Sequence, residues 1–328
     1  MTHKLNRVDE NHVPTRKTAA LMRTFSLAIA WNWEFDRDYV AGIERECRRR
    51  DLSTYRIDPS NLHDTLEQLR SGKISFQAFY DRASDADPLF LPLVQTMQES
   101  ALYFINPRFR VLHAIDKATM HLEFITHGLQ VPSTIILPPY NEQREIKLDT
   151  AKLQQLGKPF VIKPANTTGG GTGVVLNAQT VNDVIEARQL HKNDKYLLQQ
   201  FIVPKNFDGK RGWFRVYRAL NEIIPCWWDD QTHRYTELTG KEEQRLHLGE
   251  LRRIMGTIET TCGLDFFSSE IAVTEESRFI VVDYVNEVCD MRLQSKYANG
   301  APDAVVHRIE GLIADEVALR VKQFVHVT

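Results

Sequence analysis

The chain has 328 residues, of which 42% are hydrophobic and 26% charged, and its formal net charge is −2. This composition is typical of a globular protein large enough for two or three domains. A charge so near zero argues against nucleic acid as a partner, because polyanion-binding proteins carry a basic excess. The four cysteines lie far apart without a C-x-x-C pair, so neither a disulfide framework nor a structural zinc site is expected.

The sequence has no apolar run of 18 residues and no secretory signal pattern. We therefore expect no membrane contact and a cytoplasmic location. Residues 1–18 are polar and rich in charge, and we expect them to form an N-terminal arm.

Strand-like and helix-like patterns alternate over residues 19–107. Short β-branched and apolar runs predict strands at residues 25–33, 52–57, 75–80 and 101–105, and helical spacing predicts helices at residues 39–50, 61–69 and 89–98. Such alternation is typical of a parallel sheet, so we expect a small α/β domain here.

Residues 108–195 are expected to form an α+β lobe. The pattern predicts a helix that stops at Gly128, a strand at residues 131–137, and a second helix at residues 180–190 with Thr180 as its N-cap. Glycine is a common residue just beyond a helix end.

A third block, residues 196–328, is dominated by strands. They are predicted at residues 196–203, 213–220, 223–228, 268–274 and 279–285. Helical spacing predicts one helix around residues 251–258 and a C-terminal helix over residues 309–324.

A glycine-rich segment follows a short apolar run that ends in Lys163. Its residues are Gly169, Gly170, Gly171, Thr172 and Gly173, and a second apolar run follows. Glycines accept positive φ and let backbone N–H groups approach a ligand, so such a loop between two strands can cover phosphates. The Lys163 ammonium supplies a compact cation for the same phosphates. The segment predicts a nucleotide site.

Other phosphate loops fit this segment less well. A Walker A loop requires Gly-Lys-Ser/Thr and a following helix, and a dinucleotide fingerprint requires a third glycine where Val174 stands. A protein-kinase loop has its lysine on the next strand rather than before the glycines. A flexible hairpin with a solvated lysine remains the alternative, because glycine runs are common in turns.

Two carboxylates are predicted to face each other on the strands at residues 268–274 and 279–285. If the hairpin closes symmetrically around Glu276-Ser277, Glu270 lies opposite Asp283. Like charges at that spacing destabilise a sheet unless a cation compensates, and carboxylate oxygens are the ligands that magnesium prefers. Asn286 adds a neutral oxygen donor just beyond. The alternative is an exposed hairpin with two solvated acids, although apolar residues on both its faces favour burial.

The order of these motifs resembles that of the ATP-grasp superfamily, of the glutathione synthetase and RimK-like ligase type, over roughly residues 100–295. Ile105-Asn106-Pro107 and the segment that follows are similar to the family's entry segment, in which a lysine contacts nucleotide phosphates. The resemblance gives that role to Lys117. Lys163 and the glycine loop are similar to the family's second ATP lysine and its phosphate-covering loop.

The C-terminal motifs extend the resemblance. Residues 197–202 are similar to the hinge strand that binds the adenine edge, which implies ATP contacts for Gln199, Gln200, Phe201 and Ile202. Arg215 resembles the arginine that stabilises the transferring phosphoryl group and the tetrahedral intermediate. Glu270, Asp283 and Asn286 resemble the magnesium ligands.

The resemblance implies an α+β, ATP-grasp fold in which two lobes, residues 108–195 and 196–328, clasp ATP. The small α/β domain at residues 19–107 matches the domain that usually precedes this fold. The implied cofactors are ATP and Mg²⁺, with Mn²⁺ as a substitute.

Two positions depart from the family pattern. The family commonly has Glu-x-Asn on its last metal strand, whereas Asp283 and Asn286 are separated by two residues. A bulge is needed for both to reach one cation; otherwise Glu287, in phase with Asp283, is the alternative ligand. Trp213 stands where an acidic residue often precedes the arginine.

The implied activity is a carboxylate–amine ligase that forms an amide or peptide bond through an acyl phosphate, with small-molecule or peptide substrates. A kinase that phosphorylates a hydroxyl and a nucleotide-binding module without turnover are the alternatives, and the full set of lysines and acids counts against the module. The sequence leaves a homodimer open.

Several further residues have two readings. Residues 226–230, with two tryptophans, either line the acceptor pocket or pack a lobe interface. Lys210, Arg211 and Arg292 either contact a substrate carboxylate or are ordinary surface charges. Three histidines are expected to be helix-face residues rather than metal ligands, because magnesium prefers oxygen: His113, His121 and His127.

Overall fold

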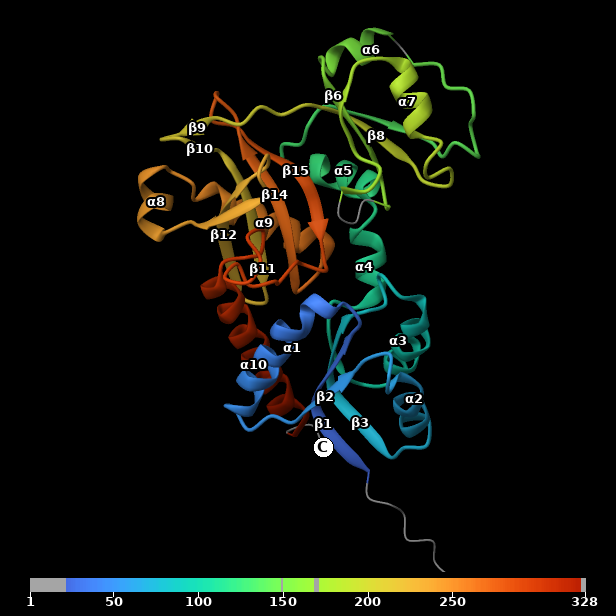
Figure 1. The fold of residues 1–328 in the computed structure, drawn as a ribbon, viewed down its shortest axis with the longest axis vertical. Helices are drawn as coiled ribbons and strands as arrows, with labels where there is room; N and C mark the ends of the chain where they lie inside the picture. Colours follow the sequence, from blue (N-terminus) through green and yellow to red (C-terminus); the bar gives the residue numbers. More distant parts are fainter. Residues whose placement is uncertain (1–21, 149, 168–170, 326–328) are drawn as a thin grey trace, which may run out of the picture.

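The computed structural model describes residues 22–148, 150–167 and 171–325. Three larger sheets follow one another along the long axis of the molecule, with helices α4 (Arg108–Ala114) and α5 (Lys117–Thr126) connecting the lower part to the upper lobe (Figure 1). The predicted arm, residues 1–18, lies outside the described residues.

The N-terminal sheet has the order β2-β1-β3-β4, and all its pairings are parallel. The predicted parallel α/β unit is therefore confirmed, while its end at residue 107 as a domain boundary remains a prediction. The strands are β1 (Arg23–Trp31), β2 (Thr54–Ile57), β3 (Ile74–Arg82) and β4 (Tyr103–Ile105). The helices are α1 (Arg37–Arg48), α2 (Leu62–Arg70) and α3 (Leu91–Gln98).

The upper lobe carries a four-stranded sheet of order β5-β8-β6-β7, with antiparallel pairings. Thr180 caps α7 as predicted, in a reciprocal capping box with Asp183. The strands are β5 (Thr134–Leu137), β6 (Phe160–Pro164), β7 (Val175–Ala178) and β8 (Tyr196–Gln200), and the helices are α6 (Thr150–Gln155) and α7 (Val181–Ala187).

The middle of the molecule is an antiparallel sheet of order β13-β12-β11-β14-β15. One face packs against α9 and α5, and the other shares a core with α10 and the N-terminal sheet. The elements are β11 (Trp213–Ala219), β12 (Glu222–Asp229), β13 (Arg234–Glu237), β14 (Phe266–Val273), β15 (Phe279–Asn286), α8 (Gly240–Arg245), α9 (Glu250–Cys262) and α10 (Asp303–Val325), with a small β9–β10 ladder of Asn206–Phe207 and Lys210–Arg211.

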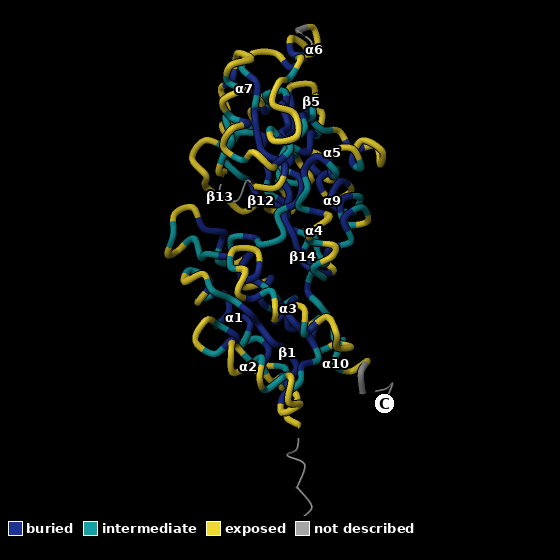
Figure 2. Tube along the Cα trace, turned by 90° about the vertical axis from the view of Figure 1, so that its right-hand side faces the viewer, coloured by how far each residue is buried: buried dark blue, intermediate teal, exposed yellow. Residues whose placement is uncertain are grey.

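Some short elements were not predicted from the sequence. α4, α6, α8 and β13 have at most seven residues each, and over such lengths periodicity carries little signal. Buried trace runs through the strands, and exposed trace lies on the outer loops and on the lobe of α6 and α7 (Figure 2).

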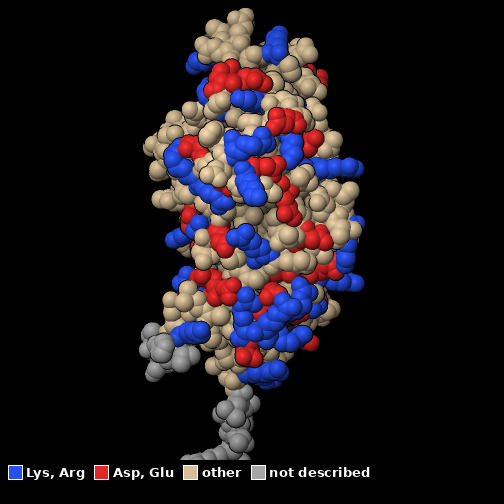
Figure 3. Space-filling view, turned by 90° about the vertical axis from the view of Figure 1, so that its left-hand side faces the viewer, with Lys and Arg blue, Asp and Glu red and all other residues tan. Residues whose placement is uncertain are grey.

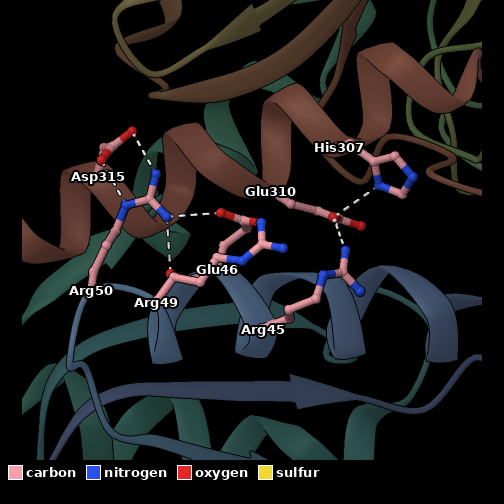
Figure 4. Close-up of polar contacts among 7 residues, drawn as sticks. All are labelled: Arg45, Glu46, Arg49, Arg50, His307, Glu310 and Asp315. Carbon is pink, nitrogen blue, oxygen red and sulfur yellow. Dashed lines mark hydrogen bonds and ion pairs between the residues drawn. The ribbon is translucent and has the colours of Figure 1, made fainter.

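Helix α10 lies along α1 and joins the C-terminal part of the chain to the N-terminal sheet (Figure 4). Arg45, Arg49 and Arg50 here pair with Glu46, Glu310 and Asp315, and these six residues form what we call the helix cluster. Glu310 is buried between the helices, and Arg45 and His307 contact its Oε2 at 3.0 and 3.1 Å.

Acidic and basic side chains are interspersed over the face in Figure 3, without a large field of one sign. Among the described residues, no helix combines the length and apolar character that crossing a membrane requires.

Candidate functional site

The Glu270–Asp283 pair forms as predicted, although the turn differs from the expected one. Next to the turn, Val273 pairs with Phe279 and Ile271 with Val281, so the hairpin loop is centred on Glu276 and not between Glu276 and Ser277. Ser277 closes that loop with a φ of 58°. A register shift between Ile271 and Glu270 then restores the facing of Glu270 and Asp283.

A second register shift brings Asn286 into phase with Glu270. The two residues between Asp283 and Asn286 lie opposite the single residue between Glu270 and Ser268, so the bulge that the departure from the family pattern required is present. With its side-chain amide oriented to satisfy both partners, the Asn286 oxygen accepts a hydrogen bond from Arg215 at 3.1 Å. Asn286 thus lies on the carboxylate face.

Glu287 lies elsewhere, in a cavity shared with the N-terminal sheet. Burial raises the pKa of its carboxyl to about 7, and neighbouring Asp85 and Asp283 raise it further while Lys117 opposes them. The geometry therefore separates Glu287 from the predicted ligand set.

Arg215 on β11 faces Glu270 across the ladder and forms an ion pair with it. A second donor, Trp213 Nε1, contacts Glu270 Oε2 at 3.0 Å, and Arg215 Nη1 donates to Ser268 Oγ at 3.2 Å. The tryptophan that departs from the family pattern thus holds the same carboxylate as the arginine. Its role was missed, because it depends on a cross-strand contact.

Lys163 and Lys117 approach the same carboxylates from the upper lobe. Lys163 Nζ donates to the Val282 carbonyl at 3.0 Å, and Lys117 Nζ lies 3.8 Å from Asp283 Oδ1. Both lysines are buried, with 6% and 8% exposure. We call Lys117, Lys163, Arg215, Glu270 and Asp283 the sheet cluster.

Burial and neighbouring charges shift the ionisation of this cluster. Burial lowers the pKa of Lys163 to about 8; Asp283 raises it, while Lys117 lowers it further. Burial alone would raise the pKa of Asp283, but Lys117, Lys163 and Arg215 together bring it below its usual value. The cluster therefore carries three cations against two anions at neutral pH, an excess of one positive charge.

A buried hydrogen-bond chain lies behind Lys163. His121 Nδ1 contacts Tyr284 Oη at 2.6 Å, and Gln199 Nε2 donates to that hydroxyl at 2.8 Å and to Thr134 Oγ1 at 3.0 Å. Burial lowers the pKa of His121 to about 4, and Lys163 contributes to this shift. His121 is on α5 as expected, but it is buried rather than on a free helix face.

The glycine loop lies between antiparallel strands β6 and β7, as its strand-like flanks predicted. Gly169 and Gly170 lie outside the described residues. Gly171 and Gly173, on either side of Thr172, have φ of 80° and 75°, and a Cβ at Gly173 would lie 3.0 Å from Pro164 Cγ. Both glycines therefore hold conformations that other residues rarely adopt.

Asp194 fixes the first residues of the loop. Its buried carboxylate accepts hydrogen bonds from the backbone N–H groups of Asn166 and Thr167 at 2.9 and 3.0 Å. Nearby, Lys195 pairs at 2.9 Å with Asp116, which caps the helix that begins at Lys117. These acids tie the loop and Lys117 to strand β8.

The predicted adenine-edge residues lie at the end of β8. Gln199 and Gln200 end the strand, and Phe201 and Ile202 follow it. The Gln199 Nε2 group donates to Thr134 and Tyr284, and Gln199 itself is paired with β5 on one side and with β6 on the other.

The two tryptophans of residues 226–230, Trp227 and Trp228, differ in their surroundings. Trp227 is buried and packs against Phe214, its cross-strand neighbour in the same sheet. Trp228 is half-buried, and its ring lies 5.2 Å from the Arg215 guanidinium carbon, so it adjoins the sheet cluster.

The three additional cations each have an acidic partner. Lys210 pairs with Glu242, Arg211 with Asp230, and Arg292 with Asp290. Their contact with a substrate carboxylate stays a prediction.

The donor set on this face fits a hard divalent cation. Glu270, Asp283 and Asn286 offer carboxylate and amide oxygens, which magnesium prefers, on one face of the hairpin. The chemistry of the donors therefore agrees with a magnesium site.

A scan against models of protein families finds no match, and a search of curated proteins finds none either. Solved structures, in contrast, match over most of the chain. A RimK domain protein ATP-grasp from Sphaerobacter thermophilus DSM 20745 has a TM-score of 0.62 at 18% identity, covering 88% of this chain and 98% of its own.

Two further structures agree. D-alanine–D-alanine ligase from Bacillus anthracis, in complex with ATP, matches with a TM-score of 0.59 at 13% identity, covering 92% of this chain and 98% of its own. The ATP-grasp ligase PsnB, with its minimal precursor, Mg and ADP, matches with a TM-score of 0.57 at 15% identity, covering 90% and 98%. The chain therefore has the ATP-grasp fold.

Proposed function

We propose that this protein is an ATP- and magnesium-dependent carboxylate–amine ligase that forms an amide or peptide bond and releases ADP and phosphate. The observation that carries the proposal is the sheet cluster: two buried lysines and an arginine converge on two facing carboxylates beside a glycine-rich loop. The ATP-grasp proteins of the same fold include ligases solved with ATP and with Mg and ADP, which supports this reading.

In this proposal the chain's cations act on the nucleotide phosphates. Lys163 and Lys117 bind the phosphates, the loop from Gly169 to Gly173 covers them, and the backbone of residues 199–202 contacts the adenine edge. Glu270, Asp283 and Asn286 would hold magnesium. The bound metal would neutralise phosphate charge.

The reaction then proceeds in two displacements. A substrate carboxylate oxygen attacks the γ-phosphorus and ADP leaves, which gives an acyl phosphate. An amine nitrogen attacks the acyl carbon, phosphate leaves, and the nitrogen loses a proton to give the amide. Arg215 stabilises the negative charge that develops on the transferring oxygens, and such charge stabilisation contributes several kcal/mol in active sites. The covering loop excludes water, which would hydrolyse the acyl phosphate.

The test is to quantify ADP and inorganic phosphate together, with Mg·ATP and pooled amino acids, dipeptides and polyols. A ligase releases both in equal amounts, and only when substrates are present. ADP without free phosphate would mean that the phosphoryl group stays on a hydroxyl acceptor, and the kinase alternative would replace the ligase.

Two variants make the assay specific. Lys163→Ala is expected to abolish substrate-dependent ADP release, and Lys241→Ala, at an exposed lysine of α8, is expected to keep it. Thermal unfolding of both variants checks that each is folded.

A further inference from the structure

Tyr284 is buried on β15, the edge strand of the middle sheet, where that sheet meets the upper lobe. Its ring belongs to the core shared with α5 and α9. Successive side chains of a strand point to opposite faces, so the ring lies on the face opposite the Asp283 carboxylate. The proposed reaction uses Asp283 and Asn286, on either side of Tyr284, but not Tyr284 itself.

The ammonium group of Lys163 lies over this ring. Lys163 Nζ is 5.1 Å from the centroid of the Tyr284 ring, which is a cation–π distance. The same ammonium donates to the Val282 carbonyl at 3.0 Å. Both partners are on β15, whereas Lys163 is on β6, so the lysine reaches from the upper lobe onto the edge of the middle sheet.

Both of these partners are neutral. Over residues 22–148, 150–167 and 171–325, no carboxylate oxygen lies within 4.0 Å of Lys163 Nζ. The other cations of the sheet cluster differ, since Lys117 lies 3.8 Å from Asp283 and Arg215 pairs with Glu270. A carbonyl and an aromatic ring orient an ammonium group without cancelling its charge. Lys163 therefore keeps its charge for an anionic ligand.

The hydroxyl of Tyr284 is fixed by two other elements. Gln199 Nε2 on β8 donates to Tyr284 Oη at 2.8 Å, and His121 Nδ1 on α5 lies 2.6 Å from the same oxygen. Because the oxygen accepts from the amide, its own proton is donated to His121 Nδ1. Burial lowers the pKa of His121 to about 4, which agrees with a neutral ring that accepts this proton.

Packing also holds the ring of Tyr284. The Phe124 ring lies 5.2 Å from it at an interplanar angle of 71°, and the His121 ring stacks at 5.9 Å and 28°. The plane of the ring below Lys163 is thus determined by neighbours on α5 as well as by the hydroxyl. Removal of the hydroxyl alone leaves these ring contacts in place.

We propose that Tyr284 is a positioning residue for Lys163: its ring holds the ammonium group at the edge of β15, directed to the nucleotide phosphates and with its charge uncompensated. The inference rests on the proposed function, in which Lys163 binds the phosphates, and it names the group that orients this lysine. Tyr284 acts through Lys163 and not by contact with the nucleotide.

The test is a calorimetric titration of Mg·ATP at pH 7.5 into variants of Tyr284. Tyr284→Met removes the ring and fills much of its volume, and the Kd is expected to rise about tenfold, as for loss of a buried cation–π contact. Tyr284→Phe keeps the ring, and its Kd is expected to stay within about threefold of the wild-type value.

Phe124→Met is the matched control. It removes an aromatic ring from the same core, but not the ring below Lys163. Both methionine variants are expected to lose thermal stability, because each leaves the core less well packed. Only Tyr284→Met is expected to weaken ATP binding, and thermal unfolding checks that each variant is folded.

A double-mutant cycle separates positioning from support of the core. In the Lys163→Ala background, Tyr284→Met is expected to change the Kd for Mg·ATP less than about twofold, because the lysine through which it acts is absent. A residue that only supports the core would weaken binding by the same factor in both backgrounds.

A fluorinated ring tests the contact without a change in packing. 3,4,5-Trifluorophenylalanine at position 284 keeps the ring but withdraws negative charge from its face, which is the part that attracts a cation. We expect its Kd to be at least about threefold above that of Tyr284→Phe. This comparison holds even if Tyr284→Met does not fold.

An unchanged Kd in Tyr284→Met, an equal rise in Phe124→Met, the same rise in the Lys163→Ala background, or equal Kd values for the two phenylalanine rings would each overturn the inference. Every readout is nucleotide affinity, so turnover does not enter. The expected affinities without release of ADP and phosphate would contradict only the proposed ligase. Release of both with an unchanged Kd in Tyr284→Met would contradict only the role of Tyr284.

Discussion

The helix cluster and the sheet cluster contain the same kinds of residue but differ in charge balance and burial. The helix cluster sets three arginines against three acids (Figure 4). The side chains of Arg45 and Arg49 are 47% and 65% exposed, whereas that of Arg50 is 25% exposed. Among the acids, Glu310 is buried and Asp315 is exposed. The sheet cluster sets three cations against two acids, and both of its lysines are buried, with the Lys117 side chain 10% exposed.

This difference separates a structural contact from a candidate ligand site. An ion pair with at least one solvent-exposed partner gains little, and a group balanced in charge has no need of a further charge. A buried cationic excess is unfavourable for folding and becomes favourable once an anion such as a phosphate binds. Balance and burial, rather than the number of ion pairs, therefore point to the site.

The largest expected effect is on turnover. Asp283→Asn removes a carboxylate of the sheet cluster and a predicted metal ligand, and we expect ADP release to fall roughly 1,000-fold, comparable to loss of about 4 kcal/mol of transition-state stabilisation. Asp315→Asn removes a carboxylate of the helix cluster and should leave the rate unchanged. Steady-state assays of both variants test the comparison; full activity of Asp283→Asn would contradict the role given to the carboxylate pair.

The second effect is a pH dependence of stability. Because the pKa of Lys163 is lowered to about 8 in the folded state, the unfolded chain binds more protons between pH 8 and the ordinary lysine value of 10.5. The free energy of unfolding contributed by this group therefore rises with pH through that window, by up to about 3 kcal/mol. Urea unfolding of the wild type and Lys163→Met from pH 7.5 to 10.5 measures it, and parallel curves would refute the burial argument.

The third effect is a loss of stability when the buried Glu310 of the helix cluster is displaced. A Cβ at Gly42 would lie 1.9 Å from Glu310 Oε1, so Gly42→Ala must displace a buried carboxylate from its partners. We expect a loss of about 2 kcal/mol in the free energy of unfolding. Gly256→Ala in α9, whose Cβ meets no atom within 4 Å, is the matched control and should stabilise by up to about 1 kcal/mol through helix propensity. Equal changes in both variants would show that Glu310 is not held in place.

The smallest effect concerns the ion pairs of Arg50, whose partner Asp315 is 63% exposed. Arg50→Gln removes the contacts to Glu46 and Asp315, yet we expect a change of only about 0.5 kcal/mol in the free energy of unfolding. A loss above 2 kcal/mol in denaturant unfolding would mean that the helix cluster is more tightly coupled than its exposure indicates.

Sequence patterns predicted the local parts of this architecture well. The parallel N-terminal unit, the loop between two strands and the facing of Glu270 and Asp283 all follow from periodicity and turn residues. The predicted symmetric closure around Glu276-Ser277 was wrong next to the turn, but the bulge near Val282 compensates for the shifted register. Register near a turn depends on the backbone conformation of a single residue, here Ser277, which the pattern does not specify.

Contacts between distant segments could not be predicted in this way. Arg82 forms a buried ion pair with Asp36 at 2.7 Å and also donates to the Cys289 carbonyl, 207 positions away, which joins the N-terminal sheet to the segment after β15. His121 and Tyr284 are 163 positions apart. Such partners are brought together by lobe packing, and local spacing contains no signal for them.

The central claim is that the cationic excess of the sheet cluster is a site for nucleotide phosphates, and the most direct test is a calorimetric titration of Mg·ATP at pH 7.5. We predict one binding site in the wild type, the same affinity in Lys241→Ala, and a Kd raised roughly 10- to 100-fold in Lys163→Ala, as expected for loss of a charged hydrogen bond. Absence of binding in the wild type, or an unchanged Kd in Lys163→Ala, would contradict the claim.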